Sequence, residues 1–456
     1  MNCQILTLDG TDLIRKYNVP GPRYTSYPTV PYWDTPPTAA TWAEHVRRTY
    51  ARTRDRGVSL YIHLPYCESL CTYCGCNTRI TVNHGVEEPY VTALLQEWAL
   101  YREVLGEDPL IREIHLGGGT PTFFRAEQLQ RLIAGLLKGG QLADGADLGF
   151  EAHPANTTDA HLRTLHALGF RRLSLGVQDF DPEVQRLINR RQSYEQVERV
   201  VQHARAIGYT SVNFDLIYGL PKQTCTTVRR TIERTLALRP ERIAFYSYAH
   251  VPWLKPAQRS FEHHLPTGGA KRRLYETGKA LLEAGGYGEI GMDHFALEDD
   301  ALRRAQRAGG LHRNFMGYTT TATELMIGLG ASSIGDAWTA FAQNHKAVEP
   351  YLASVRAGEL PIARGHVLTD EDLTLRRHIL NLMCRAETRW NTADDAVLQP
   401  AASRLREMED DGLVTLGERS IQLTERGKPF VRNACMALDA RLWRKRPETA
   451  LFSQTV

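Results

Sequence analysis

Short apolar runs alternate with helix-like stretches along the first two thirds of the chain. The apolar runs predict β-strands, and the stretches between them predict helices. Such alternation is typical of a parallel sheet whose strands are joined by right-handed crossovers. The predicted strands cover residues 59–65, 112–117, 147–152, 172–177, 211–218, 242–248 and 287–293, and the predicted helices cover 88–105, 126–138, 158–168, 181–207, 224–237 and 269–284.

About six strand–helix units predict an α/β fold, an incomplete (β/α)6 barrel with fewer than the eight units of a closed barrel. We expect four parts: an N-terminal arm at 1–55, the barrel at 56–300, a connecting segment at 301–350 that lines the active site, and a C-terminal domain at 351–456. The arm is rich in aromatic residues, so we expect it to be ordered rather than a solvated tail.

The C-terminal domain is predicted to be mostly helical and winged-helix-like. Helical patterns at 371–385 and 400–411 precede a short hairpin pattern at 412–424. This order would suggest DNA binding, but residues 401–456 hold ten Lys and Arg against eight Asp and Glu. These charges nearly cancel, so the domain does not provide the basic surface that binding to a phosphate backbone requires. We therefore expect a lid or a support for a substrate cleft.

Composition indicates a large globular enzyme. The chain has 456 residues, 42% hydrophobic and 23% charged, and a formal net charge of +3, which does not favour nucleic acid or membrane partners. Residues 1–5 show no signal peptide, and no apolar run approaches the roughly 18 residues of a membrane span. We expect a cytoplasmic protein with reduced thiols.

Four of the eight cysteines fall within ten residues, directly after the first predicted strand. Cys67, Cys71 and Cys74 have C-x3-C-x2-C spacing, which predicts ligands for three irons of a [4Fe-4S] cluster. Three protein ligands leave one iron open for a substrate or cofactor. The alternative, a structural zinc loop, needs two spaced pairs of ligands, and no matching second half occurs here.

The predicted strands end in polar or glycine residues. The second strand runs into Gly117–Gly118–Gly119–Thr120, a run that lets the backbone approach a ligand. Later strands end at or carry Glu151, Gln178, Asp215 and His250. Because the chemistry of such barrels collects at the carboxyl ends of the strands, this series predicts an active site.

The cysteine motif resembles the radical S-adenosylmethionine (SAM) superfamily. The wider set of motifs is more specific and resembles the family of oxygen-independent coproporphyrinogen III oxidases, radical SAM oxidoreductases of heme (porphyrin) biosynthesis. The segments that carry this resemblance are 17–29, 67–77, 117–121, 175–180, 215–221, 291–296, 311–315 and 432–436.

The resemblance implies a set of site residues. Cys67, Cys71 and Cys74 would bind the cluster, with Tyr61 supporting the site and Cys76 beside it. One SAM molecule would be held on the open iron and a second nearby. The first would contact Gly118, Thr120, Glu151, Gln178, Arg190 and Asp215, and the second Cys76, Gly119, Ala249, Phe315 and Ile334. The family usually has glutamine after the residue matching Phe315, and here Met316 stands there.

The implied reaction is the oxidative decarboxylation of two propionate side chains of coproporphyrinogen III to vinyl groups. A 5′-deoxyadenosyl radical would remove a β-hydrogen, and loss of carbon dioxide and one electron would follow. The resemblance also implies an electron donor such as flavodoxin or ferredoxin and a monomeric enzyme. Arginine forks are suited to the substrate carboxylates, and Arg23, Arg190, His312 and Arg313 are the candidates.

Two other functions remain open at this point. A heme chaperone of related ancestry would bind heme without turnover, but such relatives generally lack a cysteine matching Cys76 and the arm residues Arg23–Thr25. A radical SAM enzyme that transfers a methyl or methylene group to another substrate is the other alternative, and Met316 is the one feature that favours it.

Overall fold

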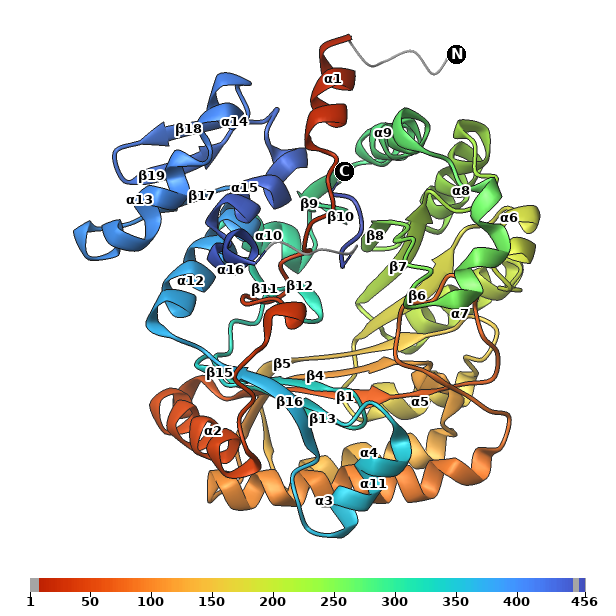
Figure 1. Ribbon diagram of the computed structural model, residues 1–456. Helices are drawn as coiled ribbons and strands as arrows, with labels where there is room; N and C mark the ends of the chain where they lie inside the picture. Colours follow the sequence, from red (N-terminus) through yellow and green to blue (C-terminus); the bar gives the residue numbers. More distant parts are fainter. Residues whose placement is uncertain (1–7, 446–450, 456) are drawn as a thin grey trace.

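The computed structural model of the chain describes residues 8–445 and 451–455. Its main element is one twelve-stranded sheet, at whose centre six neighbouring strands run parallel (Figure 1). These confirm the six predicted barrel strands. They are β1 (Val58–Leu64), β4 (Leu110–Gly118), β5 (Gln141–Ala152), β6 (Arg172–Gln178), β7 (Ser211–Tyr218) and β8 (Arg242–Ser247).

A helix follows each of these strands and covers the outside of the sheet (Figure 1). In α4, the apolar residues Leu129, Leu132, Ile133 and Leu136 recur at helical spacing and are fully buried against the sheet. The principal helices are α3 (Glu87–Leu105), α4 (Ala126–Leu137), α5 (Asp159–Ala167), α7 (Tyr194–Ile207), α8 (Cys225–Leu238) and α9 (Gly268–Ala284).

The single helix predicted at 181–207 is wrong, because two helices occupy this stretch. α6 spans Pro182–Leu187, and the chain then turns through Asn189, whose φ is +51°. Ser193 begins α7 with a capping box, in which its side chain accepts from the amide of Gln196. The break matters because the intervening turn carries Arg190 into the site described below.

The edges of the sheet differ from the simple barrel. The predicted strand 287–293 is β9 (Tyr287–Gly291), which pairs antiparallel with β10 (His294–Leu297), and β10 in turn pairs antiparallel with β8. At the other edge, β13 (Met326–Leu329) runs parallel to β1. Three antiparallel strands complete this edge: β14 (Ile334–Asp336), β15 (Ala340–Asn344) and β16 (Ile362–Val367). Residue 351, the expected boundary, lies in α11 (Val348–Arg356), which connects β15 to β16 of this sheet.

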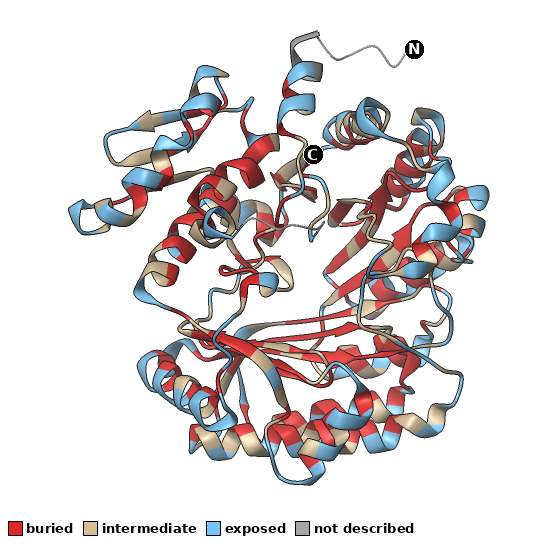
Figure 2. Ribbon diagram, viewed as in Figure 1, coloured by how far each residue is buried: buried red, intermediate tan, exposed pale blue. Residues whose placement is uncertain are grey.

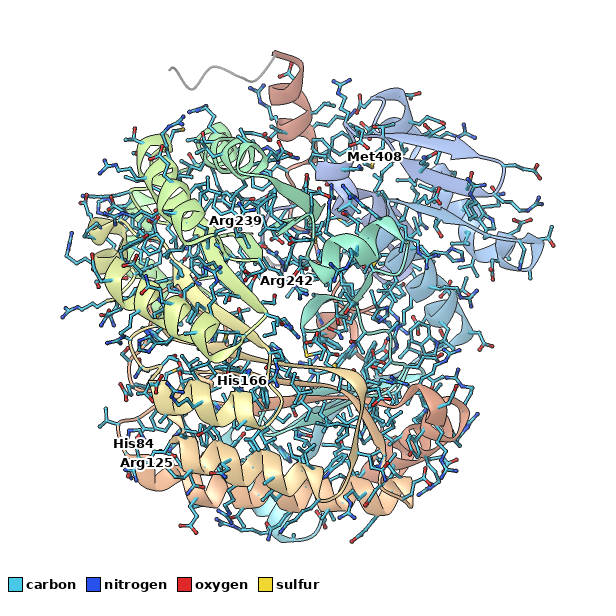
Figure 3. The ribbon with its side chains drawn as sticks, turned by 180° about the vertical axis from the view of Figure 1, so that it is seen from behind. His84, Arg125, His166, Arg239, Arg242 and Met408 are labelled. Carbon is cyan, nitrogen blue, oxygen red and sulfur yellow. The ribbon has the colours of Figure 1, made fainter. Side chains whose placement is uncertain are left out.

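Buried residues mark two cores (Figure 2). The larger core fills the space between the sheet and its helices. At the amino ends of the strands, Arg172 Nε lies 3.1 Å from Asp147 Oδ1, and Arg242 Nε lies 2.9 Å from Asp300 Oδ1. Figure 3 labels Arg242 near the middle of the molecule. These paired charges occupy the end of the barrel opposite the cysteines.

The second core joins the N-terminal arm to the C-terminal part of the chain. Tyr17 at the end of α1 (Leu8–Tyr17), together with Tyr24 and Tyr27, belongs to the same buried cluster as Ile379 of α12 (Asp370–Arg385). By contrast, α2 (Ala39–Thr53) packs on the barrel through Trp42 and Val46. The arm therefore bridges the two cores, and Figure 1 shows it running between them.

The C-terminal elements have the winged-helix order expected from the sequence. After α12, a three-stranded sheet in the order β17-β19-β18 packs with short helices. The helix predicted at 400–411 is divided in two. The elements are β17 (Glu387–Arg389), α13 (Asp395–Ser403), α14 (Arg406–Asp410), β18 (Val414–Gly417), β19 (Ser420–Leu423), α15 (Val431–Leu438) and α16 (Ala440–Arg444).

A buried carboxyl group joins α3 to the edge of the sheet. Glu97 accepts hydrogen bonds from Gly330 N at 2.8 Å, Asn344 Nδ2 at 2.7 Å and Tyr351 Oη at 2.7 Å. Burial raises the pKa of Glu97 to about 7, although these hydrogen bonds oppose the shift. The folded protein holds this proton more tightly than the unfolded chain does. The contribution of Glu97 to the free energy of unfolding is therefore complete below its ordinary pKa of 4.5 and is lost as the pH rises through 7.

We predict that Glu97→Gln flattens the dependence of stability on pH between about 5 and 8. The free energy of unfolding of the wild type should fall by on the order of 2 kcal/mol relative to the variant over this range. Thermal unfolding followed by circular dichroism at several pH values measures the difference. Glu359→Gln, at an exposed position, is the control and should track the wild type. Parallel pH profiles for wild type and Glu97→Gln would contradict the assignment.

Candidate active site

The cysteine loop lies at the carboxyl end of β1. The short strands β2 (Tyr66–Cys67) and β3 (Arg79–Ile80) pair in parallel, with Cys67 opposite Ile80, so the loop leaves and rejoins the barrel close to one place. Cys67, Cys71, Cys74 and Cys76 all line a cavity of about 260 Å³ at the carboxyl ends of the barrel strands. The predicted ligands are therefore brought together, at the end of the barrel where the sequence places the site.

The glycine run at the end of β4 holds the start of this loop. Gly119 N donates to Leu64 O at 2.8 Å, and Thr120 N donates to Tyr66 O at 3.0 Å. A β-carbon on Gly119 would lie 2.6 Å from the carbonyl oxygen of Pro65, so no other residue fits without moving backbone. Thr120 Oγ1 then lies 3.3 Å from Cys67 Sγ, and the first cysteine is fixed against β4.

Polar side chains from successive strands face the same cavity. Glu151 of β5, Gln178 of β6 and Asp215 of β7 line it together with Gly118, Gly119 and Thr120. Glu151 accepts from Gly118 N at 3.3 Å, and Asp215 accepts from Asn213 Nδ2 at 2.9 Å. These groups offer both donors and acceptors to a polar ligand seated beside the cysteines.

Glu151 and Asp215, two of the carboxyl groups that line the cavity, have different acidities. Burial, together with the charge of Glu151, raises the pKa of Asp215 to about 7. Burial also opposes ionisation of Glu151, but hydrogen bonds from His115 and the Gly118 amide outweigh it and lower the pKa of Glu151 below its ordinary value. At neutral pH Glu151 is therefore negatively charged, whereas Asp215 can either donate or accept a hydrogen bond.

Arg190 provides the positive charge beside the sulfur atoms. The turn between α6 and α7 brings its buried guanidinium to the cavity, where Nη2 donates to Gly176 O and Nη1 lies 3.7 Å from Cys71 Sγ. A β-carbon on Gly176 would lie 2.8 Å from Gln178 Nε2 and 3.0 Å from Arg190 Nη2. The glycine therefore makes room for both side chains, and the cation lies beside the Cys71 sulfur.

The fourth cysteine lies next to the third. A hydrogen bond from Cys76 lowers the pKa of Cys74 to about 6, whereas burial raises the pKa of Cys67 to about 11. Cys67 would lose its proton on binding iron, because metals bind the thiolate. Lys255 Nζ donates to Cys76 O at 2.7 Å and fixes this end of the loop.

Tyr61 does not line the cavity but supports its wall. Its hydroxyl lies 3.1 Å from His63 Nδ1, and His63 Nε2 lies 2.9 Å from Asn77 O, just beyond the cysteines. His63 was not among the site residues predicted from the sequence. Its spacing of two residues from Tyr61 on one strand, which places both on one face of the sheet, was the available signal.

The residues assigned to a second SAM molecule are less closely gathered. Cys76 and Gly119 line the cavity, whereas Ala249, Phe315 and Ile334 are not part of its lining. Ala249 O accepts from Gln258 Nε2 at 3.3 Å, and the same nitrogen donates to Tyr73 O at 3.1 Å, which brings this segment to the cysteine loop. Phe315 instead packs against Phe341, with ring centroids 5.6 Å apart.

Met316 lies in a tight hairpin. The antiparallel strands β11 (His312–Asn314) and β12 (Gly317–Thr319) leave only Phe315 and Met316 between them. The amide of Met316 donates to Asn314 Oδ1 at 2.9 Å. The backbone at this position is therefore fixed independently of the side chain that it carries.

Two further cavity residues were missed from the sequence. Tyr246 of β8 and His153, two residues after Glu151, both line the cavity. Burial, reinforced by the charge of Arg190, lowers the pKa of His153 to about 3, so its imidazole is neutral at physiological pH. The sixth predicted strand was expected to end at 248–250, and the side chain that lines the cavity lies two residues earlier, at Tyr246.

The donor set fits an iron–sulfur cluster. Three thiols from one compact loop face a shared cavity, with a cation and backbone amides beside them. Among the residues that the structure describes, no group of three or more His, Cys, Asp or Glu is arranged to hold a single metal ion. A cubane cluster distributes its ligands over separate corners, so its cysteines need not converge on one point.

The chain was compared with known proteins. Residues 61–235 match the radical SAM superfamily. The oxygen-independent coproporphyrinogen III oxidase of Salmonella typhimurium is 39% identical over 452 residues, which cover 97% of this chain and 98% of the relative. The protein of the same name from Synechocystis is 35% identical over 98% of this chain and 97% of the relative.

Among solved structures, that of coproporphyrinogen III oxidase from Escherichia coli, described as a radical SAM enzyme, superposes with a TM-score of 0.87 at 38% sequence identity. The superposition covers 92% of this chain and 97% of the other. Both the barrel and the arrangement of the parts around it are therefore shared with this relative.

We predict that Cys67→Ser, Cys71→Ser and Cys74→Ser each abolish the iron–sulfur cluster, because each removes one of three thiolates that the loop brings to the cavity. Iron content and the visible absorbance of the anaerobically reconstituted protein measure the loss. Cys76→Ser is the matched control in the same loop and should retain its iron. A full cluster in any of the first three variants, or loss of iron from Cys76→Ser equal to that from Cys74→Ser, would show that the ligands are assigned wrongly.

Proposed function

The chain belongs to the family of oxygen-independent coproporphyrinogen III oxidases, and we propose that it converts two propionate side chains of coproporphyrinogen III to vinyl groups. The product is protoporphyrinogen IX, an intermediate of heme biosynthesis. The observation that carries this proposal is the cavity in which three cysteines of the C-x3-C-x2-C loop meet the glycine run and the polar strand ends.

The cofactors of this enzyme class are a [4Fe-4S] cluster and SAM. Cys67, Cys71 and Cys74 would hold the cluster, and Gly118, Thr120, Glu151, Gln178, Arg190 and Asp215 would hold SAM beside it. When bound, this pair supplies a 5′-deoxyadenosyl radical by one-electron cleavage of SAM. The residues of the chain position the reacting groups and exclude water, as a buried polar cavity does.

We also propose a second SAM molecule, in contact with Cys76, Gly119, Ala249, Phe315 and Ile334. Support comes from Cys76 and Gly119, which line the cavity, and from the bonds through Gln258 that tie the Ala249 segment to the loop. Phe315 and Ile334 lie outside that lining, so their contact with SAM would require the ligand to extend toward β14.

The remaining partners are proposals too. The cysteine loop needs an electron from a small reductant such as flavodoxin or ferredoxin, and we propose that the enzyme acts as a monomer in the cytoplasm, where thiols stay reduced. The four cysteines of the loop, Cys67, Cys71, Cys74 and Cys76, are free thiols. In the part of the chain that the structure describes, no helix has the length and apolar character needed to cross a membrane.

A methyl or methylene transfer by the same radical chemistry is the second candidate function, and Met316 is the observation that favours it. An apolar thioether replaces the usual amide next to Phe315, which changes the groups available to a second SAM. The heme-chaperone alternative is less favoured, because Cys76 lines the cavity and Arg23 forms an ion pair with Asp293.

We predict that the anaerobically reconstituted wild type converts coproporphyrinogen III to protoporphyrinogen IX when SAM and a reductant are supplied. It should consume close to two SAM molecules per product, because each of two propionates loses one hydrogen atom to one radical. Chromatography of the tetrapyrroles and of 5′-deoxyadenosine measures both quantities. Cleavage of SAM without any protoporphyrinogen would reject the oxidase and favour the transferase, and stable heme binding without turnover would favour the chaperone.

We predict that Met316→Gln preserves or raises turnover. The hairpin backbone does not depend on this side chain, and the variant restores an amide that can bond to a charged ligand. One such hydrogen bond contributes about 1.5–3 kcal/mol, so a gain of about tenfold or more in SAM affinity is expected. Titration of SAM against turnover measures it, with Met316→Leu as the control without an amide. A strong loss of decarboxylation in Met316→Gln alone would contradict this role.

A further inference from the structure

Arg313 has a buried guanidinium, two of whose nitrogens lack a hydrogen-bond acceptor among the described residues. It lies on β11, and only 3% of its surface is exposed. Its Nε and Nη1 atoms have no hydrogen-bond partner within the described residues. Its guanidinium makes a cation–π contact with the ring of Tyr318, whose centroid lies 4.4 Å from Arg313 Cζ. A cation taken out of water in this way is unfavourable unless an anion joins it, so the geometry points to a missing ligand.

The neighbouring carboxylates already have other arginine partners. Asp293 interacts electrostatically with Arg313. It forms an ion pair with Arg23, and its Oδ1 lies 3.0 Å from His294 Nδ1. Burial would raise the pKa of Asp293, but the charge of Arg23 outweighs it and holds that pKa below its ordinary value. Asp293 is therefore paired with Arg23, and it attracts Arg313 without a hydrogen bond between the two.

The second carboxylate near Arg313 is also engaged. Asp336 accepts from Arg376 Nη1 at 3.1 Å. His312, the neighbour of Arg313 in the chain, does not add a charge, because burial lowers its pKa to about 4. Arg23 and Arg376 thus each have an aspartate at ion-pair distance, whereas Arg313 has none among the described residues.

The N-terminal arm covers this guanidinium. Arg313 and Asn314 line a small cavity with Tyr24, Thr25 and Ser26 of the arm, and its volume is about 10 Å³. Asn314 Oδ1 accepts from Met316 N, which leaves the amide NH2 of Asn314 as a donor. Such a volume holds about one water molecule, so a carboxylate enters only when the arm segment 24–26 moves aside.

A short series of aromatic contacts links Arg313 to the active site. The ring of Tyr318, beneath the guanidinium, lies 5.3 Å from the ring of His294, which lies 5.5 Å from the ring of Tyr246. Tyr246 lines the cysteine cavity. Three successive side-chain contacts therefore separate Arg313 from the cysteine cavity.

We propose that Arg313 binds a propionate carboxylate of the tetrapyrrole while a different propionate lies at the radical site. The guanidinium offers parallel N–H donors that match the two oxygens of a carboxylate, and Asn314 adds a further donor. This assignment rests on the proposed function, and it makes Arg313 a residue for substrate binding and orientation. The carboxylate of a SAM molecule has the same chemistry and is the competing source.

The test compares Arg313→Met with wild type. Methionine keeps an unbranched side chain that can pack on the Tyr318 ring but removes the charge. Quenching of tetrapyrrole fluorescence measures the Kd for coproporphyrin III, the stable oxidised form of the substrate, and steady-state assays measure the KM for coproporphyrinogen III. We expect both constants to rise about tenfold or more, as for loss of one charged hydrogen-bonding pair. SAM cleavage without tetrapyrrole should be unchanged.

Arg404→Met is a control at an exposed position, because Arg404 also lies over an aromatic ring, 4.9 Å from the centroid of Trp443, but in the C-terminal part of the chain. It should leave both constants unchanged. Unchanged constants in a folded, cluster-containing Arg313→Met would overturn the proposal, as would loss of SAM affinity with tetrapyrrole binding intact. If Arg313→Met does not fold, Arg313→Lys keeps the charge without the fork and should still raise the Kd; wild-type affinity would overturn the proposal.

Failure of the proposed function gives a different result from failure of this site. A wild type that neither binds coproporphyrin III nor converts coproporphyrinogen III removes the function itself. A wild type that does both, alongside an Arg313→Met variant that does both equally well, removes only the assignment of Arg313.

Discussion

The close approach of the glycine run to the chain leaving β1 is the constraint on which the site depends. Gly119 leaves no room for a β-carbon beside Pro65, and two backbone hydrogen bonds tie Gly119 and Thr120 to Leu64 and Tyr66. These contacts fix where the cysteine loop begins. The bonds from Tyr61 through His63 to Asn77 fix where it ends. Rigid anchors at both ends allow an otherwise irregular loop to present thiols in a defined arrangement.

The fold follows from the sequence where local pattern and tertiary packing agree. The six parallel strands and helices such as α4 could be predicted, because their apolar residues have the period of the element and pack on one core. The break between α6 and α7 could not, since a left-handed residue at Asn189 gives no periodic signal. The four strands β13, β14, β15 and β16 were also not predicted. They are short and follow a long irregular stretch, and they form strands because they pair at the edge of the sheet.

The candidate site shows a similar division. Residues at strand ends and in the cysteine loop were predicted, and Glu151, Gln178, Arg190 and Asp215 do line one cavity with the thiols. Tyr246 and His153 were missed because their roles depend on which residues face the cavity, which spacing alone did not decide. Ala249, Phe315 and Ile334 rested on the family resemblance, and the described cavity does not include them. The arm and C-terminal elements meet in a second core, so the substrate side is built from segments far apart in the chain.

The most direct test of the central claim follows hydrogen from substrate to cofactor product. Coproporphyrinogen III carrying deuterium at the β-carbons of its propionates would be incubated anaerobically with reconstituted enzyme, SAM and reductant, and the 5′-deoxyadenosine would be analysed by mass spectrometry. The account predicts 5′-deoxyadenosine that carries one deuterium, formed together with vinyl products. Vinyl products accompanied only by unlabelled 5′-deoxyadenosine would contradict it.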